Sequence, residues 1–178
     1  SLGGVLGLLF AAQHPQRVRT LSLISAPVYI SDHDKTSTTY GHGSRIEALR
    51  KMGARAWALA SNSGRRFPAE ADPGLLQWYV DEMGKADVET LVAMFSWVSS
   101  ATTVPHLASI TAPVMGIYPT QGPITDETQI ALLKEHVKNL RLIRIASQYH
   151  ALQNLMPATC ADQVLHFAAE CDGLVCHE

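Results

Sequence analysis

The sequence predicts an α/β fold in which a parallel sheet flanked by helices carries a helical insertion. At both ends of the chain, short apolar runs bounded by proline or polar turns alternate with longer helix-like stretches. The middle, residues 29–108, has helical spacing and no convincing strand. The 178 residues are 47% hydrophobic and 17% charged, which provides material for a core and excludes a disordered chain.

The first segment, residues 1–28, predicts a buried helix and then a strand, both belonging to the α/β core. The apolar stretch that follows Ser1-Leu2-Gly3-Gly4 runs to Ala12 and stops at His14-Pro15, because proline disfavours helical geometry in the residue before it. Leu21 to Ser25 is a short apolar run followed by Ala26-Pro27, which is typical of a strand.

The middle segment, residues 29–108, predicts three amphipathic helices over residues 45–61, 73–84 and 87–99. Ser44 is a suitable cap for the first of them, and Pro73 suits the first turn of the second. Because these helices lie between two α/β segments, we interpret them as an inserted cap. Their aromatic residues, at helical spacing, are expected mostly in the core: Trp57, Trp78, Tyr79, Phe95 and Trp97.

The last segment, residues 109–178, returns to alternating strands and helices. We expect strands at Pro113–Tyr118 and Leu140–Ile145 and helices at Glu127–Val137 and Ala158–Ala169. Strands joined by helices should be parallel, with right-handed crossovers. Three strands are too few for a complete domain of this class, because a parallel sheet needs both faces covered and its edges protected. We therefore expect a preceding segment or a second polypeptide to supply the remaining strands.

Composition excludes several classes of partner. The 14 basic and 16 acidic residues leave a net charge of −2, which offers no broad basic surface for nucleic acid. The longest apolar run, Val5 to Ala12, is much shorter than the roughly 20 residues of a membrane span. Cys160, Cys171 and Cys176 are few and odd in number, which does not suggest a disulfide framework. We expect a reducing compartment and a cytoplasmic location.

Three short motifs stand in a characteristic order. Ser1-Leu2-Gly3-Gly4 looks like the serine and downstream small residues of a G-x-S-x-G turn, whose upstream glycine is absent here. His14-Pro15-Gln16-Arg17-Val18 and Ile110-Thr111-Ala112-Pro113-Val114 follow in order. These motifs resemble the second half of an α/β-hydrolase, cut at its nucleophile elbow, and the resemblance covers nearly all the chain.

The resemblance implies Ser1 as nucleophile and His150 as general base, because the family's histidine lies after the last strand and before the final helix. The Leu2 N–H would supply half of the oxyanion hole. The usual acid is missing, since Gln121 or Gly122 stands where the carboxylate is expected. Asp126 is the nearest substitute, although its spacing to Gln129 also fits a helix capping box. The alternative is an acid supplied by a residue outside this chain.

The function implied is hydrolysis of a carboxylic ester, lactone or related acyl substrate through an acyl-enzyme. We expect one or two of the cap aromatics to line an apolar pocket between cap and sheet, which would suit a hydrophobic acyl or ring substrate. Carboxylesterases, enol-lactonases and carbon–carbon bond hydrolases of the family act on substrates of this kind. No organic cofactor is required. Cys171, Cys176 and His177 form a C-x₄-C-H cluster without a fourth ligand, so we expect no metal.

Ser1 as first residue allows three interpretations: a numbering artefact, cleavage before the elbow serine, or an N-terminal nucleophile hydrolase whose α-amine is the base. The last uses antiparallel sheets, so we favour a cleaved two-fragment hydrolase whose N-terminal fragment completes the sheet. A different class stays open, namely a catalytically weak or inactive hydrolase-like protein that binds a small molecule in the cap. The missing acid supports that alternative.

Overall fold

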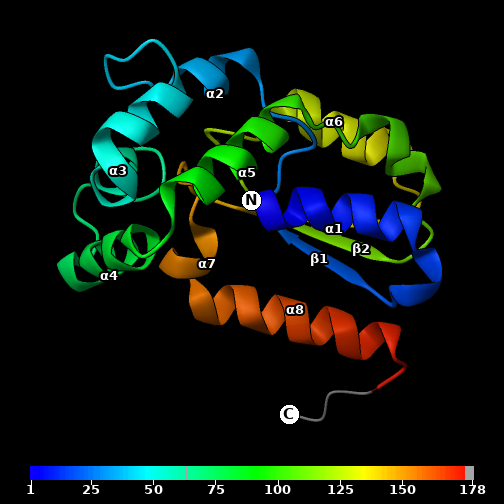
Figure 1. Ribbon diagram of the computed structural model, residues 1–178. Coiled ribbons are helices and arrows are strands. Elements are labelled where there is room, and N and C mark those ends of the chain that lie inside the picture. Colours follow the sequence, from blue (N-terminus) through cyan, green and yellow to red (C-terminus); the bar gives the residue numbers. More distant parts are fainter. Residues whose placement is uncertain (63, 175–178) are drawn as a thin grey trace. The chain divides into compact units, whose positions relative to one another are not determined.

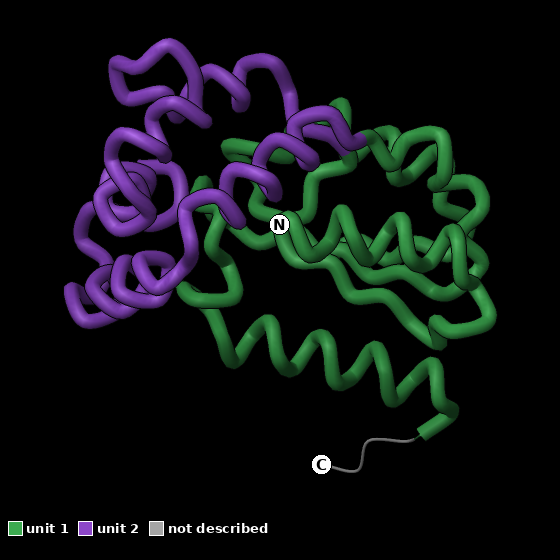
Figure 2. Tube along the Cα trace, in the orientation of Figure 1, with its two compact units in different colours: residues 1–28, 102–178 green, residues 29–101 purple. Residues whose placement is uncertain are grey.

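The computed structural model describes residues 1–62 and 64–174, which divide into two units (Figure 2). Unit 1 joins the two ends of the chain, residues 1–28 and 102–178, and unit 2 consists of residues 29–101. The second boundary lies earlier than the predicted one, because the 3₁₀ helix η2 (Val104–Ser109) packs against the first helix in unit 1.

Unit 1 contains helices on either side of three strands (Figure 1). Its elements are α1 (Leu2–Gln13), η1 (Pro15–Arg17), β1 (Leu21–Ile24), η2, β2 (Val114–Pro119), α6 (Glu127–His136), β3 (Leu140–Ile145), α7 (Leu152–Leu155) and α8 (Pro157–Cys171). Unit 2 contains α2 (Asp32–Thr36), α3 (Arg45–Asn62), α4 (Pro73–Gly84) and α5 (Val88–Ser100). In the described part of the chain, no helix has both the length and the apolar character needed to cross a membrane.

The sheet has the strand order β1-β2-β3, and both pairs are parallel. Ile24 of β1, Ile117 of β2 and Ile143 of β3 stand in register, so the carboxyl ends of all three strands reach the same edge. This arrangement confirms the predicted parallel sheet flanked by helices. The edge that collects the strand ends is where parallel α/β proteins place their ligands.

Two helices cover opposite faces of the sheet, as Figure 1 shows for α1 and α8. Leu23 of β1 lies against Gly4 of α1. The next residue, Ile24, packs instead with Cys160 and Phe167 of α8, because successive side chains of a strand point to opposite faces. Unit 1 therefore has three layers, and the loops after the strands emerge between its helices.

Unit 2 has a core of its own. Trp57, fully buried on α3, packs against Phe95 of α5 with the ring centroids 5.1 Å apart. Gly53, at φ 78°, interrupts α3, a conformation that favours glycine. The expectation that the aromatic residues lie mostly in the core holds for Trp57 but is wrong for Trp78 and Trp97, which are 51% and 40% exposed.

Candidate active site

Ser1 lies at the carboxyl end of β1, immediately before α1. Its main-chain nitrogen donates a hydrogen bond to the carbonyl of Ile24, the last residue of β1, at 2.8 Å. Its carbonyl accepts from the N–H of Gly4 at 2.8 Å and so belongs to the first turn of the helix. The serine is exposed and its hydroxyl does not cap α1. Ser1 therefore lies at the edge of the sheet where the strands end.

Leu2 is the first residue of α1. The first N–H groups of a helix have no acceptor within the helix and carry the positive end of its dipole. An oxygen that gains negative charge beside Ser1 would be stabilised by this N–H and by the helix terminus. The described geometry is compatible with the predicted oxyanion-hole role of Leu2.

His150 lies in the loop between β3 and α7, as predicted for the catalytic histidine. The residue is 3% exposed, and the next two, Ala151 and Leu152, are also buried. The sequence did not predict α7, whose single turn is too short to show helical periodicity. This turn and the packing of Leu152 under the sheet fix the backbone that carries His150.

The loops after β2 and β3 are tied together by backbone hydrogen bonds. The Thr120 N–H donates to the Ile145 carbonyl at 2.8 Å, and the Gln121 N–H donates to the Ser147 carbonyl at 3.0 Å. The guanidinium of Arg144 donates to the Pro119 carbonyl at 3.1 Å and pairs with Glu127. In the family that this chain resembles, the loop after β2 carries the acid. Here that loop runs beside the loop after β3, which leads to His150.

Asp126 is the cap of α6. Its Oδ1 accepts a hydrogen bond from the Gln129 N–H at 2.9 Å, which is the geometry that their spacing indicates. Of the two positions where the acid was expected, Gln121 is exposed, whereas Gly122 has no room for a side chain. A Cβ atom on Gly122 would lie 2.8 Å from the Thr125 carbonyl oxygen.

Sequence reasoning missed a strained residue at the same edge. Ser25 follows β1 in the left-handed region, at φ 48°, and is 2% exposed. Its hydroxyl is buried and has no hydrogen-bond partner among the described residues. The adjoining Ala26 carbonyl accepts from the Tyr118 hydroxyl at 2.9 Å, and burial raises the pKa of Tyr118. Such strain clusters at functional sites. The sequence carries no signal of it, because serine, unlike glycine, does not favour a positive φ.

Within the described residues, no group of three His, Cys, Asp or Glu side chains is arranged to bind a metal. Cys171 is exposed and has a free thiol. The other two members of the C-x₄-C-H cluster, Cys176 and His177, lie outside the described residues.

Comparisons with known proteins give the fold its name. The sequence matches no protein-family model and no curated protein sequence. Among solved structures, the chain superposes on the enol-lactonase from Burkholderia xenovorans LB400 with a TM-score of 0.81, 22% identity and 94% of this chain covered. MGS-M2, an alpha/beta hydrolase enzyme from a Medee basin deep-sea metagenome library, gives a TM-score of 0.72, 16% identity and 100% coverage of this chain.

The chain has the α/β-hydrolase fold. A structure from work on carboxylesterases of the thaumarchaeon Nitrososphaera gargenis also matches, with a TM-score of 0.79, 20% identity and 97% of this chain covered. The chain spans 62% of the enol-lactonase and 64% of each of the other two proteins. The resemblance inferred from the motifs is thereby confirmed at the level of fold, and this chain corresponds to part of these longer proteins.

Proposed function

We propose that this α/β-hydrolase chain carries the serine and histidine of a hydrolase acting on a carboxylic ester, lactone or related acyl substrate. The observation that supports this most directly is the shared edge. Ser1 is bonded to the carboxyl end of β1, and His150 follows the carboxyl end of β3, with the two strand ends in register through β2. The chain order of serine before histidine is also that of the family.

The reaction proceeds through an acyl-enzyme. The Ser1 Oγ attacks the carbonyl carbon while His150 takes the hydroxyl proton, and the oxyanion receives a hydrogen bond from the Leu2 N–H. The tetrahedral intermediate expels the alcohol, which takes the proton from His150. Water then attacks the acyl-enzyme with His150 again as base, and the carboxylic acid leaves as Ser1 recovers its proton. No redox step or cofactor is needed.

The acid of the triad is proposed to be Asp126, and one substitution separates its two possible roles. Asn caps helices as well as Asp does, so Asp126→Asn keeps the cap of α6 while it removes the carboxylate. If Asp126 orients His150, ester hydrolysis falls by about 10²-fold or more with unchanged stability. Unchanged hydrolysis by Asp126→Asn would mean that Asp126 acts as a cap alone.

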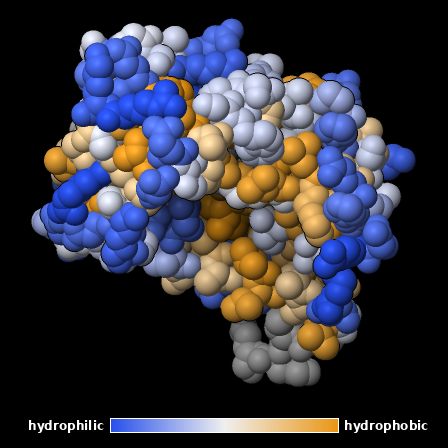
Figure 3. All heavy atoms as spheres, viewed as in Figure 1, coloured by the Kyte–Doolittle hydropathy of each residue, from blue (hydrophilic) through white to orange (hydrophobic). Residues whose placement is uncertain are grey.

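We further propose that an N-terminal fragment of the same protein completes the sheet beside β1. β1 is an edge strand of the described sheet, and its Ile24 lines a hollow of about 390 Å³ together with Val164 and Leu165 of α8. Leu6 and Phe10 of α1 are 48% and 42% exposed. Figure 3 shows hydrophobic residues gathered over α1 and toward α8 on the visible face of unit 1. Exposed strand edges and apolar patches of this kind favour pairing.

The two-fragment state has its own test. The intact mass of the protein purified from its native source distinguishes one continuous chain from two associated fragments. Because cleavage would relax the elbow beside Ser1, we expect the cleaved form to turn over esters more slowly than an uncleaved form. Equal rates for both forms would contradict that part of the proposal.

A cytoplasmic location is proposed from the thiols. Both described cysteines, Cys160 and Cys171, are free, and the Cys171 thiol is exposed. Exposed thiols persist in reducing compartments. Alkylation during rapid lysis should capture Cys171 as a reduced thiol, whereas recovery of an oxidised Cys171 would argue for another compartment.

The decisive test of the hydrolase is labelling by a fluorophosphonate probe together with hydrolysis of p-nitrophenyl butyrate. We expect a mass increase on Ser1, and we expect both the labelling and the hydrolysis to be lost in Ser1→Ala and in His150→Asn. Gln13→Ala, which changes an exposed residue at the last position of α1, is the matched control on the same helix. Labelling that persists in Ser1→Ala would contradict the assignment.

The second candidate is a hydrolase-like protein that binds a small molecule without turning it over. The use of Asp126 as a cap, and the absence of a carboxylate at residues 121 and 122, favour this alternative. A folded native protein that neither labels nor hydrolyses esters would support the binder. The third alternative, an N-terminal nucleophile hydrolase, is disfavoured because its sheets are antiparallel and those of this chain are parallel.

A further inference from the structure

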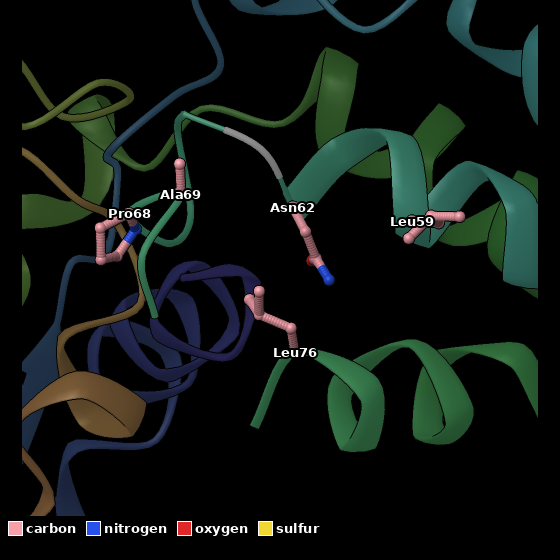
Figure 4. Close-up of a pocket in the computed structure, with 5 residues that line it drawn as sticks. All are labelled: Leu59, Asn62, Pro68, Ala69 and Leu76. Atoms are coloured by element: carbon pink, nitrogen blue, oxygen red, sulfur yellow. The ribbon is translucent and has the colours of Figure 1, made fainter. Parts of the chain in front are cut away.

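A hollow of about 230 Å³ lies within unit 2, between α3, α4 and the loop that joins them (Figure 4). Its walls are formed by Leu59, Asn62, Pro68, Ala69 and Leu76. All five residues belong to unit 2, and none belongs to the Ser1 and His150 site. The proposed hydrolysis therefore assigns no role to this hollow or to the one polar side chain that lines it.

Asn62 is that polar side chain. It is 5% exposed, and Figure 4 shows its amide directed into the hollow toward Leu76. Neither the amide oxygen nor the amide nitrogen has a hydrogen-bond partner among the described residues, although the main-chain carbonyl accepts from the Phe67 N–H at 3.3 Å. Buried side-chain amides almost always have partners, because burying them without hydrogen bonds is unfavourable.

The side chains of the remaining walls are apolar and offer the amide no hydrogen-bond partner. Leu59 and Leu76 present aliphatic groups from two helices, and Pro68 and Ala69 complete the loop side. At roughly 30 Å³ of liquid volume per water molecule, the hollow equals the space of about eight waters. It is large enough for a single ring with one short substituent, and ligand sites typically combine such apolar walls with a few fixed polar groups.

We propose that this hollow binds a small, mainly apolar molecule that carries a carboxamide or a carboxylic acid. A primary amide offers two N–H donors and one acceptor oxygen in a plane, and it pairs best with a group that presents a donor beside an acceptor. Asn62 then forms two parallel hydrogen bonds with the ligand, while Leu59 and Leu76 enclose its ring. The inference does not depend on Ser1 or His150.

Benzamide is the probe, and the full chain is titrated with it in an NMR experiment that observes ¹⁵N-labelled asparagine. The chain has three asparagines, Asn62, Asn139 and Asn154, so the spectrum carries its own controls. The Asn139 side chain already donates to Thr111, at 3.4 Å, and that of Asn154 accepts from Gln153, at 3.0 Å. We expect saturable shifts of the Asn62 side-chain amide and none for the other two.

Two variants make the assignment specific. Asn62→Leu keeps the approximate volume but removes the amide, and it should raise the dissociation constant of benzamide about tenfold while the affinity for toluene is kept or improved. The matched control is Gln77→Leu on α4, since it removes an exposed amide that does not line this hollow. Circular dichroism establishes that both variants are folded.

The outcomes decide between the possible occupants. Binding of benzamide that is equally strong in Asn62→Leu overturns the proposal. An Asn62 amide whose resonance does not respond to benzamide up to its solubility limit also overturns it, because an ordered water is then its partner. Retained benzamide binding in Ser1→Ala separates this site from the proposed hydrolase, so a failure of one inference is recognisable without the other.

Discussion

Gly4 allows α1 to approach the loop after β1, and replacing it tests how the position of Ser1 is determined. A Cβ atom at Gly4 would lie 2.2 Å from the Cβ of Ala26 and 3.4 Å from a methyl group of Leu23. Ala26 is fully buried, and its carbonyl is held by Tyr118. Gly4→Ala therefore cannot be accommodated by rotating a flexible side chain, and the helix or the loop has to move.

The magnitude follows from two opposing effects. Carbon atoms in contact lie about 3.5–4.0 Å apart, so the two Cβ atoms must separate by about 1.5 Å. Overpacking of this kind costs about 1–3 kcal/mol. Alanine in a helix is favoured over glycine by up to about 1 kcal/mol. Gly4→Ala should therefore lower the free energy of unfolding by up to about 2 kcal/mol, and by about 1–3 kcal/mol relative to a glycine-to-alanine change that makes no such contact.

Gly3→Ala is the matched control, because an added Cβ there meets nothing within 4 Å. It receives the same helix-propensity gain without the contact, so the difference between the two variants isolates the steric cost. Urea unfolding followed by circular dichroism should give a lower midpoint for Gly4→Ala and an equal or higher one for Gly3→Ala. Equal midpoints for the two variants would refute the close packing of α1 on Ala26.

Two further predictions concern the loops beside the site. If His150 lacks an orienting carboxylate, Gln121→Asp should raise ester hydrolysis about tenfold or more, which is part of the roughly 10⁴-fold effect of a triad aspartate. Gly122→Asp should instead lower the stability of the protein, because its side chain would collide with the Thr125 carbonyl. No gain in hydrolysis from Gln121→Asp would point to Asp126 as the acid. Tyr118→Phe should cost about 1 kcal/mol at pH 7, since the bond to Ala26 is lost. Burial raises the pKa of Tyr118 above its value in the unfolded chain. The neutral phenol therefore contributes its full stabilisation below about pH 10. Above that pH the free energy of unfolding should fall by up to about 1.4 kcal/mol per pH unit. Urea unfolding at pH 7 and at about pH 11 tests this, and an equal alkaline loss in Tyr118→Phe would contradict it.

Much of the fold could be predicted because local signals and tertiary packing agree. Proline at His14-Pro15 ends the pattern of α1 where the helix ends, and Asp87 caps α5 through the Thr90 N–H at 2.8 Å. The strand at Leu140–Ile145 has the predicted bounds, since a short segment rich in leucine and isoleucine between turn residues is typical of a strand. The positions expected of Ser1 and His150 rest on the resemblance to the α/β-hydrolase family, and the order of strands and loops agrees with that resemblance.

Other features could not be predicted because they arise from contacts that periodicity does not encode. The short helices α2 and α7 contain too few residues for a repeat to appear. The exposure of Trp78 depends on which side of α4 lacks a neighbour, and a helical pattern alone does not reveal that. The buried amide of Asn62 looks like an ordinary polar residue at the end of a helix until its surroundings are known.

The geometry at the sheet edge is set by core packing more than by the groups that would do chemistry. Ala26 contacts Gly4 of α1 on one side, and its carbonyl accepts the hydroxyl of Tyr118 from β2 on the other. The preceding Ser25 is held in the left-handed region by this arrangement, while its N–H donates to the Ile117 carbonyl at 2.9 Å. Since the same short loop fixes both α1 and β2, a single steric change at Gly4 should move Ser1 relative to the loops after β2 and β3. If packing at Gly4 determines the position of Ser1 in this way, Gly4→Ala should lose fluorophosphonate labelling. The labelling is measured at a urea concentration where the variant is still folded.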